Sequence, residues 1–272
     1  MVRVTVVFPE GKHKVLTMSY DDGKEADRRL VALFNRYALK GSFHLNSGLF
    51  HTEGRIPSHE IADLFKGHEV SAHTYTHPTI ERSPKEQLIS EIMEDRKQLE
   101  QITGYTVRGM SYPNGSYNSL IKSMLPFLGI EYARTVNSTG SFAMPDDFLE
   151  WNPTCHHKQN LVEKSKTFAS LHKTQYLYMM YVWGHSYEFD LDDNWGMMEE
   201  FCAYIAGRDD IWYATNIEIV DYMNAFRALK FSADSRFVYN PSAQSVWLNV
   251  EEEIVEVKGG TTLTLAGQKS TS

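Results

Sequence analysis

The sequence predicts an α/β fold, in which a closed, barrel-like array of about seven strands carries a small β appendage at its C-terminal end. As far as residue 230, β-type runs alternate with helical runs, a pattern typical of βαβ units with parallel strands. After Lys230 the helical period stops, and short β-type runs surround a Gly-Gly turn. We therefore expect a barrel over residues 1–230 and a β-rich extension over 231–272, which would serve as a structural cap or as an oligomerisation or carbohydrate-contacting element.

Seven β-rich runs are the expected strands of the barrel. They cover residues 14–23, 42–48, 68–74, 106–115, 131–137, 148–157 and 176–189, and residues 211–215 lead into a last helix. The first of them, KVLTMSYDDG, is typical in that a β-rich stretch ends in turn residues. In a parallel barrel the carboxyl ends of all strands meet at one face, where the active site lies.

The runs between the strands have helical spacing or helix-end signals. Residues 25–41 place apolar side chains at helical intervals and end at Gly41, and Pro57 and Gly67 stand near the two ends of the next helix. The run at 83–104 opens with Ser83, Pro84 and Glu86, a capping-box pattern with proline at the first helical position. Further helices are predicted over 116–129 and 216–230.

Charge and composition exclude several classes of protein. The net charge of −8 argues against binding to the phosphate backbone of a nucleic acid, and no apolar run is long enough to span a bilayer. The first residues, MVRVTVVFPEGKHKV, lack the apolar core and cleavage site of a secretory signal. With two cysteines, Cys155 and Cys202, a disulfide framework is not expected. These features favour a cytoplasmic protein, or an extracellular one from which a signal has been removed.

Polar residues follow several of the predicted strands. The first strand ends in Asp21 and Asp22, the third ends at His73 with His77 just beyond, and a late strand ends at His185. Each of these features alone is commonplace, since Asp-Asp-Gly suits a turn and most histidine pairs of this spacing bind nothing. Together, at the strand ends, they are the parts of a hydrolase with one metal ion.

Such a hydrolase needs side chains in distinct roles. Two imidazoles and one carboxylate hold the ion and leave a position open for water, whose pKa the ion lowers. A second carboxylate accepts the proton of that water, and a histidine on the other side protonates the leaving group. The neighbours Asp21 and Asp22 can divide these roles, because adjacent residues of a strand point to opposite faces.

SYDDG, HTYTHP, YPNG and WGH resemble, in this order, the motifs of the polysaccharide deacetylases, which are carbohydrate esterase family 4 or the NodB-homology type. The resemblance covers about residues 12–230. It implies a distorted (β/α) barrel that removes acetyl groups from an acetylated carbohydrate with the help of one divalent metal ion. That ion is usually zinc, and cobalt and nickel are possible. The first two motifs are specific and the others are looser.

The resemblance also implies a role for individual residues. Asp21 would be the general base, Asp22, His73 and His77 the metal ligands, and His185 the acid. The backbone N–H of Asn114, in the Pro-Asn-Gly turn, would help to hold the oxyanion. The segments around these motifs add candidates for contact with the oxyanion or the substrate, which are Tyr112, Trp151, His156 and His157.

The sequence departs from the family at two motifs. Ser111 stands where the family has an arginine that steadies the catalytic aspartate, and Arg108 lies nearby but out of register. The Asp-rich fourth motif of the family is matched only loosely by DDFLEW, in which Glu150 is the candidate for the role of the motif's acidic residue. These departures affect the expected substrate and rate, and they leave the metal ligands unchanged.

The leading hypothesis is therefore a metal-dependent deacetylase acting on an N- or O-acetylated carbohydrate. A hydrolase of small non-peptide amides on the same fold is a second hypothesis, motivated by the altered third motif. A catalytically weak, metal-containing sugar-binding protein is a third, although pure binding requires neither Asp21 nor His185. The sequence does not indicate the oligomeric state.

Overall fold

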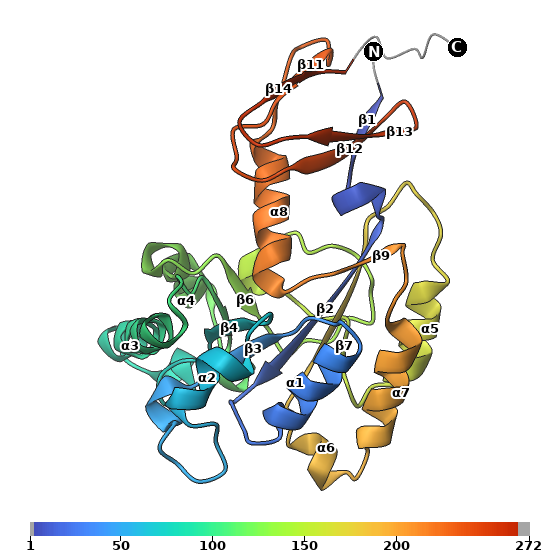
Figure 1. The fold of residues 1–272 in the computed structure, drawn as a ribbon. Coiled ribbons are helices and arrows are strands. Elements are labelled where there is room, and N and C mark those ends of the chain that lie inside the picture. The colour runs from blue at the N-terminus through green and yellow to red at the C-terminus, as the bar shows by residue number, and fades with distance from the viewer. Residues whose placement is uncertain (1–2, 266–272) are drawn as a thin grey trace.

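The structure is a computed structural model, and it describes residues 3–265. Its centre is a parallel sheet of eight strands that curls into a distorted barrel with helices around it (Figure 1). The strands are β2 (Lys14–Asp21), β3 (Ser42–Leu45), β4 (Glu69–Ala72), β5 (Gly109–Ser111), β6 (Tyr132–Arg134), β7 (Cys155–His156), β8 (Tyr178–Gly184) and β9 (Ile211–Tyr213). The sheet order is β6-β5-β4-β3-β2-β8-β7, and β9 pairs with β2 beside the start of that strand. The predicted α/β barrel is confirmed, and the strand beyond the seven expected is β9.

One residue closes the gap between the two edges of this sheet. The backbone N–H of Trp151 donates to the carbonyl oxygen of Ala133 in β6, and the N–H of Thr135 donates to the carbonyl of Trp151, both at 3.0 Å. Four residues later the same segment pairs with β8, where Cys155 lies opposite Val182. The run from 151 to 156 therefore joins β6 to β8, and the closure is distorted because it depends on a single bridge.

The helices lie on the outside of the barrel. They are α1 (Asp27–Arg36), α2 (Ser58–Leu64), α3 (Lys85–Thr103), α4 (Ser119–Met124), α5 (Leu161–Ala169), α6 (Glu188–Leu191), α7 (Trp195–Ile205) and α8 (Asn216–Ala228). Those predicted from the sequence are α1, α2, α3, α4 and α8, whereas α5, α6 and α7 were not. Within the described residues, none of the helices has the length and apolar character that crossing a membrane requires.

The central strand β2 is buried along its whole length. All eight residues of β2 are buried, because β3 and β9 share one of its edges, β8 covers the other, and helices cover the outside. Its polar residues Thr17, Ser19 and Asp21 alternate with apolar Leu16, Met18 and Tyr20, so one face of this buried strand is polar. The last helix, α8, begins with a capping box in which Thr215 and Glu218 satisfy each other's backbone N–H groups.

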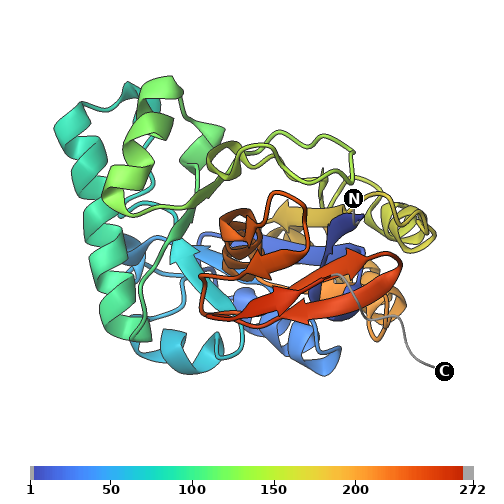
Figure 2. The ribbon, with the colours of Figure 1, turned by 90° about the horizontal axis from the view of Figure 1, so that it is seen from above.

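The β appendage is confirmed, and it consists of two small antiparallel sheets. One contains β1 (Val4–Val7), β12 (Val246–Val250) and β13 (Glu253–Val257), and the other contains β10 (Lys230–Phe231), β11 (Phe237–Tyr239) and β14 (Thr262–Thr264). It lies over the amino ends of the barrel strands, opposite their carboxyl ends (Figures 1 and 2). The N-terminal strand β1 thus belongs to the same sheet as β12. The division at residue 230 stays a prediction, and residues 266–272 of the predicted extension lie outside the described part.

Gly109 makes room for a large side chain inside the barrel. A Cβ atom at this position would stand 1.9 Å from Cε1 of Tyr132, its partner across β5 and β6. We expect Gly109→Ala to lower the free energy of unfolding by about 1–3 kcal/mol, since overpacking forces buried groups apart. Urea titration measures this, and Gly196→Ala is the control, because a Cβ there meets nothing within 4 Å. An unchanged stability for Gly109→Ala would show that the ring of Tyr132 moves freely.

Candidate metal and catalytic site

The end of β2 directs two carboxylates to different sides. Asp21, its last residue, points into the barrel and is buried, while Asp22 is half-buried and adopts a φ of 85°. This left-handed turn is sparsely populated for residues other than glycine, so the surrounding structure must hold it. Arg55 helps to do so, because its guanidinium donates to the carbonyl oxygen of Asp22.

The two histidines of HTYTHP lie beside Asp22. His73 follows β4 directly, and positive φ values at Thr74 (65°) and His77 (62°) turn the chain back, so that the two rings are 4.7 Å apart. Nε2 of His77 lies 3.8 Å from Oδ1 of Asp22. Ligand atoms of Asp22, His73 and His77 all lie within 4.8 Å of one another, a grouping able to hold a metal ion. The structure therefore brings the three predicted ligands together.

Hydrogen bonds from neighbouring elements hold the His73 turn. The side-chain amide of Asn46 donates to the carbonyl oxygens of His73 (2.6 Å) and Thr74 (2.9 Å). Asp95, from α3, accepts from the backbone N–H of His73 at 2.9 Å and from both the backbone and the hydroxyl of Ser47. Burial raises the pKa of Asp95 to about 7, an effect that these hydrogen bonds oppose.

The ring of His73 suits a metal ion. Burial lowers the pKa of His73 to about 4, so the imidazole is neutral at pH 7. Its Nδ1 lies 3.0 Å from the carbonyl oxygen of Ser111. In the tautomer that donates to this carbonyl, Nε2 keeps its lone pair for an ion, which is the arrangement usual for histidine ligands. The chemistry of the three donors, two imidazoles and a carboxylate, matches a divalent cation such as Zn²⁺.

Asp21 is surrounded by donors and positive charge. Burial by itself raises the pKa of Asp21, but Arg134, His73 and His44 outweigh it and bring that pKa well below its usual range. Arg134, at the end of β6, forms a buried ion pair with Asp21, and the hydroxyl of Ser111 donates to it at 3.1 Å. Asp21 is therefore ionised at neutral pH. The arginine absent at Ser111 is replaced, in this contact, by Arg134 from the next strand.

A chain of polar groups leads from Asp21 down through the barrel. Nδ1 of His44 lies 3.4 Å from Oδ1 of Asp21, and its Nε2 lies 3.3 Å from the hydroxyl of Tyr132. That hydroxyl donates to Glu69 at 2.7 Å, while Ser42 and the backbone N–H of Ile217 donate to the same carboxyl group. Burial raises the pKa of Glu69 to about 7. The catalytic end of the barrel is thus linked to its opposite end by hydrogen-bonding side chains.

His185 follows β8 and contacts an acidic residue one helical turn later. Its Nδ1 lies 3.4 Å from Oε2 of Glu188, the first residue of α6. Burial lowers the pKa of His185, but Glu188, Asp21 and Asp22 raise it by more, so that the net shift is upward. This favours the protonated imidazolium, the form that a general acid needs.

Glu188 also contacts both histidines of TCHH. His156 and His157 approach its Oε2 at 3.0 and 3.4 Å, and Lys158 approaches its Oε1 at 3.2 Å. His156, His157 and Glu188 lie close enough to share an ion. With the ammonium group of Lys158 on one carboxylate oxygen, however, the cluster is better suited to anchoring His185 than to binding a second cation.

Replacing Glu188 with glutamine is expected to alter the pH dependence of the reaction. The loss of this carboxylate lowers the pKa of His185, so the imidazolium loses its proton at lower pH and the alkaline limb of the kcat/KM profile moves to lower pH. Profiles of Glu188→Gln and of Glu163→Gln, whose exposed carboxylate pairs only with Lys166 among the described residues, test this. Identical profiles for both variants and the original protein would contradict the assigned contact.

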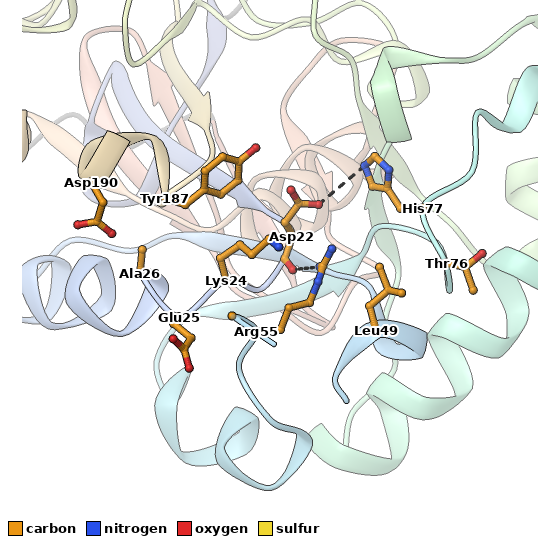
Figure 3. Close-up of a pocket in the computed structure, with 11 residues that line it drawn as sticks. Asp22, Lys24, Glu25, Ala26, Leu49, Arg55, Thr76, His77, Tyr187 and Asp190 are labelled. Carbon is orange, nitrogen blue, oxygen red and sulfur yellow. Dashed lines mark hydrogen bonds and ion pairs between the residues drawn. The ribbon is translucent and has the colours of Figure 1, made fainter. Parts of the chain in front are cut away.

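A pocket of about 730 Å³ opens beside the proposed ligands (Figure 3). Two of them, Asp22 and His77, line it together with Leu49, Thr76 and Tyr187. Four charged residues complete its polar wall, namely Lys24, Glu25, Arg55 and Asp190. The pocket is broad enough for a sugar ring, and it reaches the ligands from the solvent side.

The remaining predicted residues are more scattered. Asn114 is exposed in its turn with a φ of 56°, and its side chain donates to Thr79 at 3.2 Å. Tyr112 and Trp151 are almost completely buried. The hydroxyl of Tyr112 donates to the carbonyl of Leu149, and Trp151 packs edge-on against Tyr132. In this structure neither ring has an open face for a sugar, and the roles predicted for Asn114, His156 and His157 stay predictions.

Four buried or charged residues near the site were missed from the sequence, each with a weak signal. Arg134 and His44 are polar residues inside short apolar strands, which is uncommon unless they are paired. Glu188 follows His185 by three residues at the start of a helix. Asp27, in the first turn of α1, is fully buried, and burial raises the pKa of its carboxyl group to about 8. Glu150, the candidate from DDFLEW, forms an ion pair with Lys122.

Comparisons with known proteins agree with this geometry. The family described as polysaccharide deacetylase matches residues 9–133. A peptidoglycan-N-acetylglucosamine deacetylase of Listeria monocytogenes is 24% identical over 123 residues, which are 44% of this chain and 26% of that protein. The chain thus spans about a quarter of the length of the curated relatives it matches. The resemblance inferred from the motifs is confirmed.

Solved structures share the fold. A Mycobacterium smegmatis protein assigned to the polysaccharide deacetylases superimposes with a TM-score of 0.62 at 16% identity, over 84% of this chain and 96% of that one. A family 4 acetyl xylan esterase of Clostridium thermocellum, solved with a cobalt ion, superimposes with a TM-score of 0.53 at 11% identity, over 75% and 89%. At these identities the likeness concerns the arrangement of strands and helices.

Proposed function

We propose that this chain, whose residues 9–133 match the polysaccharide deacetylase family, is a metal-dependent hydrolase that removes acetyl groups from an acetylated carbohydrate. One observation carries the proposal. Ligand atoms of Asp22, His73 and His77 lie within 4.8 Å of one another, and the ionised carboxylate of Asp21 lies beside them. A base next to three metal ligands is the arrangement that metal-assisted hydrolysis requires.

Asp22, His73 and His77 would hold the cation. When bound, a divalent cation polarises a carbonyl group and lowers the pKa of water next to it. Zn²⁺ is the expected ion, with Co²⁺ or Ni²⁺ as alternatives, because the same donors suit all three. The cobalt ion in the acetyl xylan esterase structure supports this choice of ions.

Asp21 would accept the proton of the attacking water. Arg134 and Ser111 fix its carboxylate in place, and the same charges keep it ionised. His185, held by Glu188, would donate a proton to the nitrogen or oxygen of the departing sugar. The two groups therefore differ in protonation state at the same pH, as a base and an acid must.

The test is acetate release by the protein after loading with Zn²⁺, Co²⁺ or Ni²⁺ in turn. N-acetylglucosamine oligomers and O-acetylated xylan form one arm, and simple amides and ureides form the other. Release of acetate from an acetylated sugar, dependent on the added ion, is the expected result. If only the amides are cleaved, the activity belongs to another class of hydrolase. If sugars bind without acetate being released, the protein is a binding protein.

A further inference from the structure

The charged residues of the pocket differ in whether they have partners. Of its acidic residues, Glu25 lies 3.7 Å from the guanidinium of Arg28, and Asp190 accepts from the indole N–H of Trp195 at 2.7 Å. The third, Asp22, faces His77 and is a proposed metal ligand. Each of these three carboxylates therefore contacts a donor of the protein, although only Glu25 faces an arginine or lysine.

The basic residues of the same pocket are not neutralised. Within the described residues 3–265, neither Lys24 nor Arg55 forms an ion pair. Arg55 uses one terminal nitrogen, NH1, to donate to the carbonyl oxygen of Asp22 and, at 3.1 Å, to Oδ1 of Asn46. Its Nε and its other terminal nitrogen have no acceptor in this part of the chain. That edge of the guanidinium is the one that pairs side by side with a carboxylate.

Backbone pairing fixes the two cations next to each other. Lys24 and Arg55 form an antiparallel bridge, flanked by hydrogen bonds from Glu25 N–H to the Gly54 carbonyl (3.1 Å) and from Ile56 N–H to the Gly23 carbonyl (2.9 Å). Figure 3 shows both side chains extending toward Asp22. Backbone hydrogen bonds therefore hold Lys24 and Arg55 side by side in the pocket wall. Lys24 follows the proposed metal ligand Asp22 by two residues.

Two adjacent cations without counter-ions destabilise the folded protein when no ligand is bound. Arg55 is half-buried and forms no ion pair within the described residues, so its charge lacks both full hydration and a counter-ion. The chain has a net charge of −8, so acidic residues outnumber basic ones, and two adjacent cations without counter-ions are unusual in this protein. An anionic group of a ligand would compensate both.

We propose that the pocket binds an acetylated sugar that carries a carboxylate, which Arg55 pairs through its free edge and Lys24 attracts as a point charge. This rests on the proposed function and narrows its substrate class. A neutral acetylated sugar would leave both cations without a partner. The carboxylate would lie away from Asp21, because Lys24 and Arg55 line the pocket together with Asp22 and His77, whereas Asp21 is buried and does not line it.

The test compares matched substrates that differ only in charge. N-acetylmuramic acid and N-acetylglucosaminuronic acid, which carry the carboxylate at different ring positions, are each compared with their methyl ester. We expect kcat/KM for at least one acid to exceed that of its ester by about tenfold, the factor that corresponds to about 1.4 kcal/mol. N-acetylglucosamine 6-phosphate is tested as a further substrate. If its kcat/KM exceeds that of both acids, the pocket selects a phosphate and the choice of a carboxylate is overturned.

Variants link this preference to the two residues. Lys24→Gln removes an ammonium group that forms no hydrogen bond or ion pair within the described residues, so folding should be unaffected, and Arg55→Gln removes the guanidinium. Each should bring the acid-to-ester ratio close to one, while Lys258→Gln, with the same charge change in the appendage, should keep it. Equal kcat/KM for acid and ester in the unaltered protein, or an unchanged ratio in both variants, would overturn the proposal.

Binding separates this proposal from the proposed function. Calorimetry on metal-loaded Asp21→Asn measures the Kd of each acid and ester without turnover. Tighter binding of the acid, lost in the Lys24→Gln background, supports a carboxylate site even if no sugar releases acetate, in which case the deacetylase assignment alone fails. Equal Kd values for acid and ester would overturn the carboxylate site and leave the deacetylase assignment standing.

Discussion

His73→Ala is expected to lose both the bound metal ion and the hydrolysis of acetylated sugars. The variant keeps one imidazole and one carboxylate, too few donors for a stable tetrahedral site. A metal ion supplies several kcal/mol of transition-state stabilisation, so acetate release should fall by about a thousandfold or more. Elemental analysis of the dialysed protein and an acetate assay measure the two effects.

Two further variants make this result specific. His172→Ala removes an exposed histidine whose ring contacts only the carbonyl of Ser170 among the described residues, and it should retain metal and activity. His77→Ala removes a half-buried ligand, so it disturbs the core less than His73→Ala and should also lose the ion. Full metal content in both His73→Ala and His77→Ala would place the metal site elsewhere.

Arg134→Met is expected to destabilise the fold by about 3–5 kcal/mol, because it leaves the buried carboxylate of Asp21 without its counter-ion. Without Arg134, burial dominates and the pKa of Asp21 rises, so a larger share of the base is protonated at neutral pH. The variant should therefore lose activity and stability together. Urea unfolding and the acidic limb of the pH-rate profile are the measurements.

A double variant separates these two effects. Arg134→Met combined with Asp21→Asn removes both charges, so most of the lost stability should return while activity stays low. If the double variant is as unstable as the sum of the single changes, the ion pair contributes little, and Arg134 matters mainly through its packing on Trp183, whose ring centroid is 4.5 Å from its guanidinium carbon.

The grouping of the proposed metal ligands was predictable because each lies at or just beyond the end of a predicted strand. Asp22 comes directly after β2 and His73 directly after β4, and parallel strands bring their carboxyl ends to one face. The contacts that surround them join positions far apart in the chain. Asp21 and Arg134 are 113 residues apart, and only the sheet order β6-β5-β4-β3-β2 brings them together. No local pattern contains that information.

The positions of two aromatic side chains also could not be predicted from local sequence patterns. Trp151, a predicted substrate contact, and Tyr187, which follows His185 by two residues, both lie near strand ends. The structure places Tyr187 on the pocket and Trp151 in the core, where it closes the barrel. Near the irregular bridge that closes the barrel, packing across the whole barrel decides whether an aromatic side chain points into the core or toward the pocket. The alternation of residues in one short strand does not reveal this.

The strand β1 has a consequence for the order in which the chain is made. Val4 pairs with Val250, so β1 leaves the ribosome long before its partner strand β12 has been synthesised. Until then its backbone edge is open to wrong partners, and the closing of so long a loop carries an entropic cost. The barrel can fold before β1 pairs with β12. Chains that stop before Val246 are therefore expected to aggregate through this edge even when their barrel is complete.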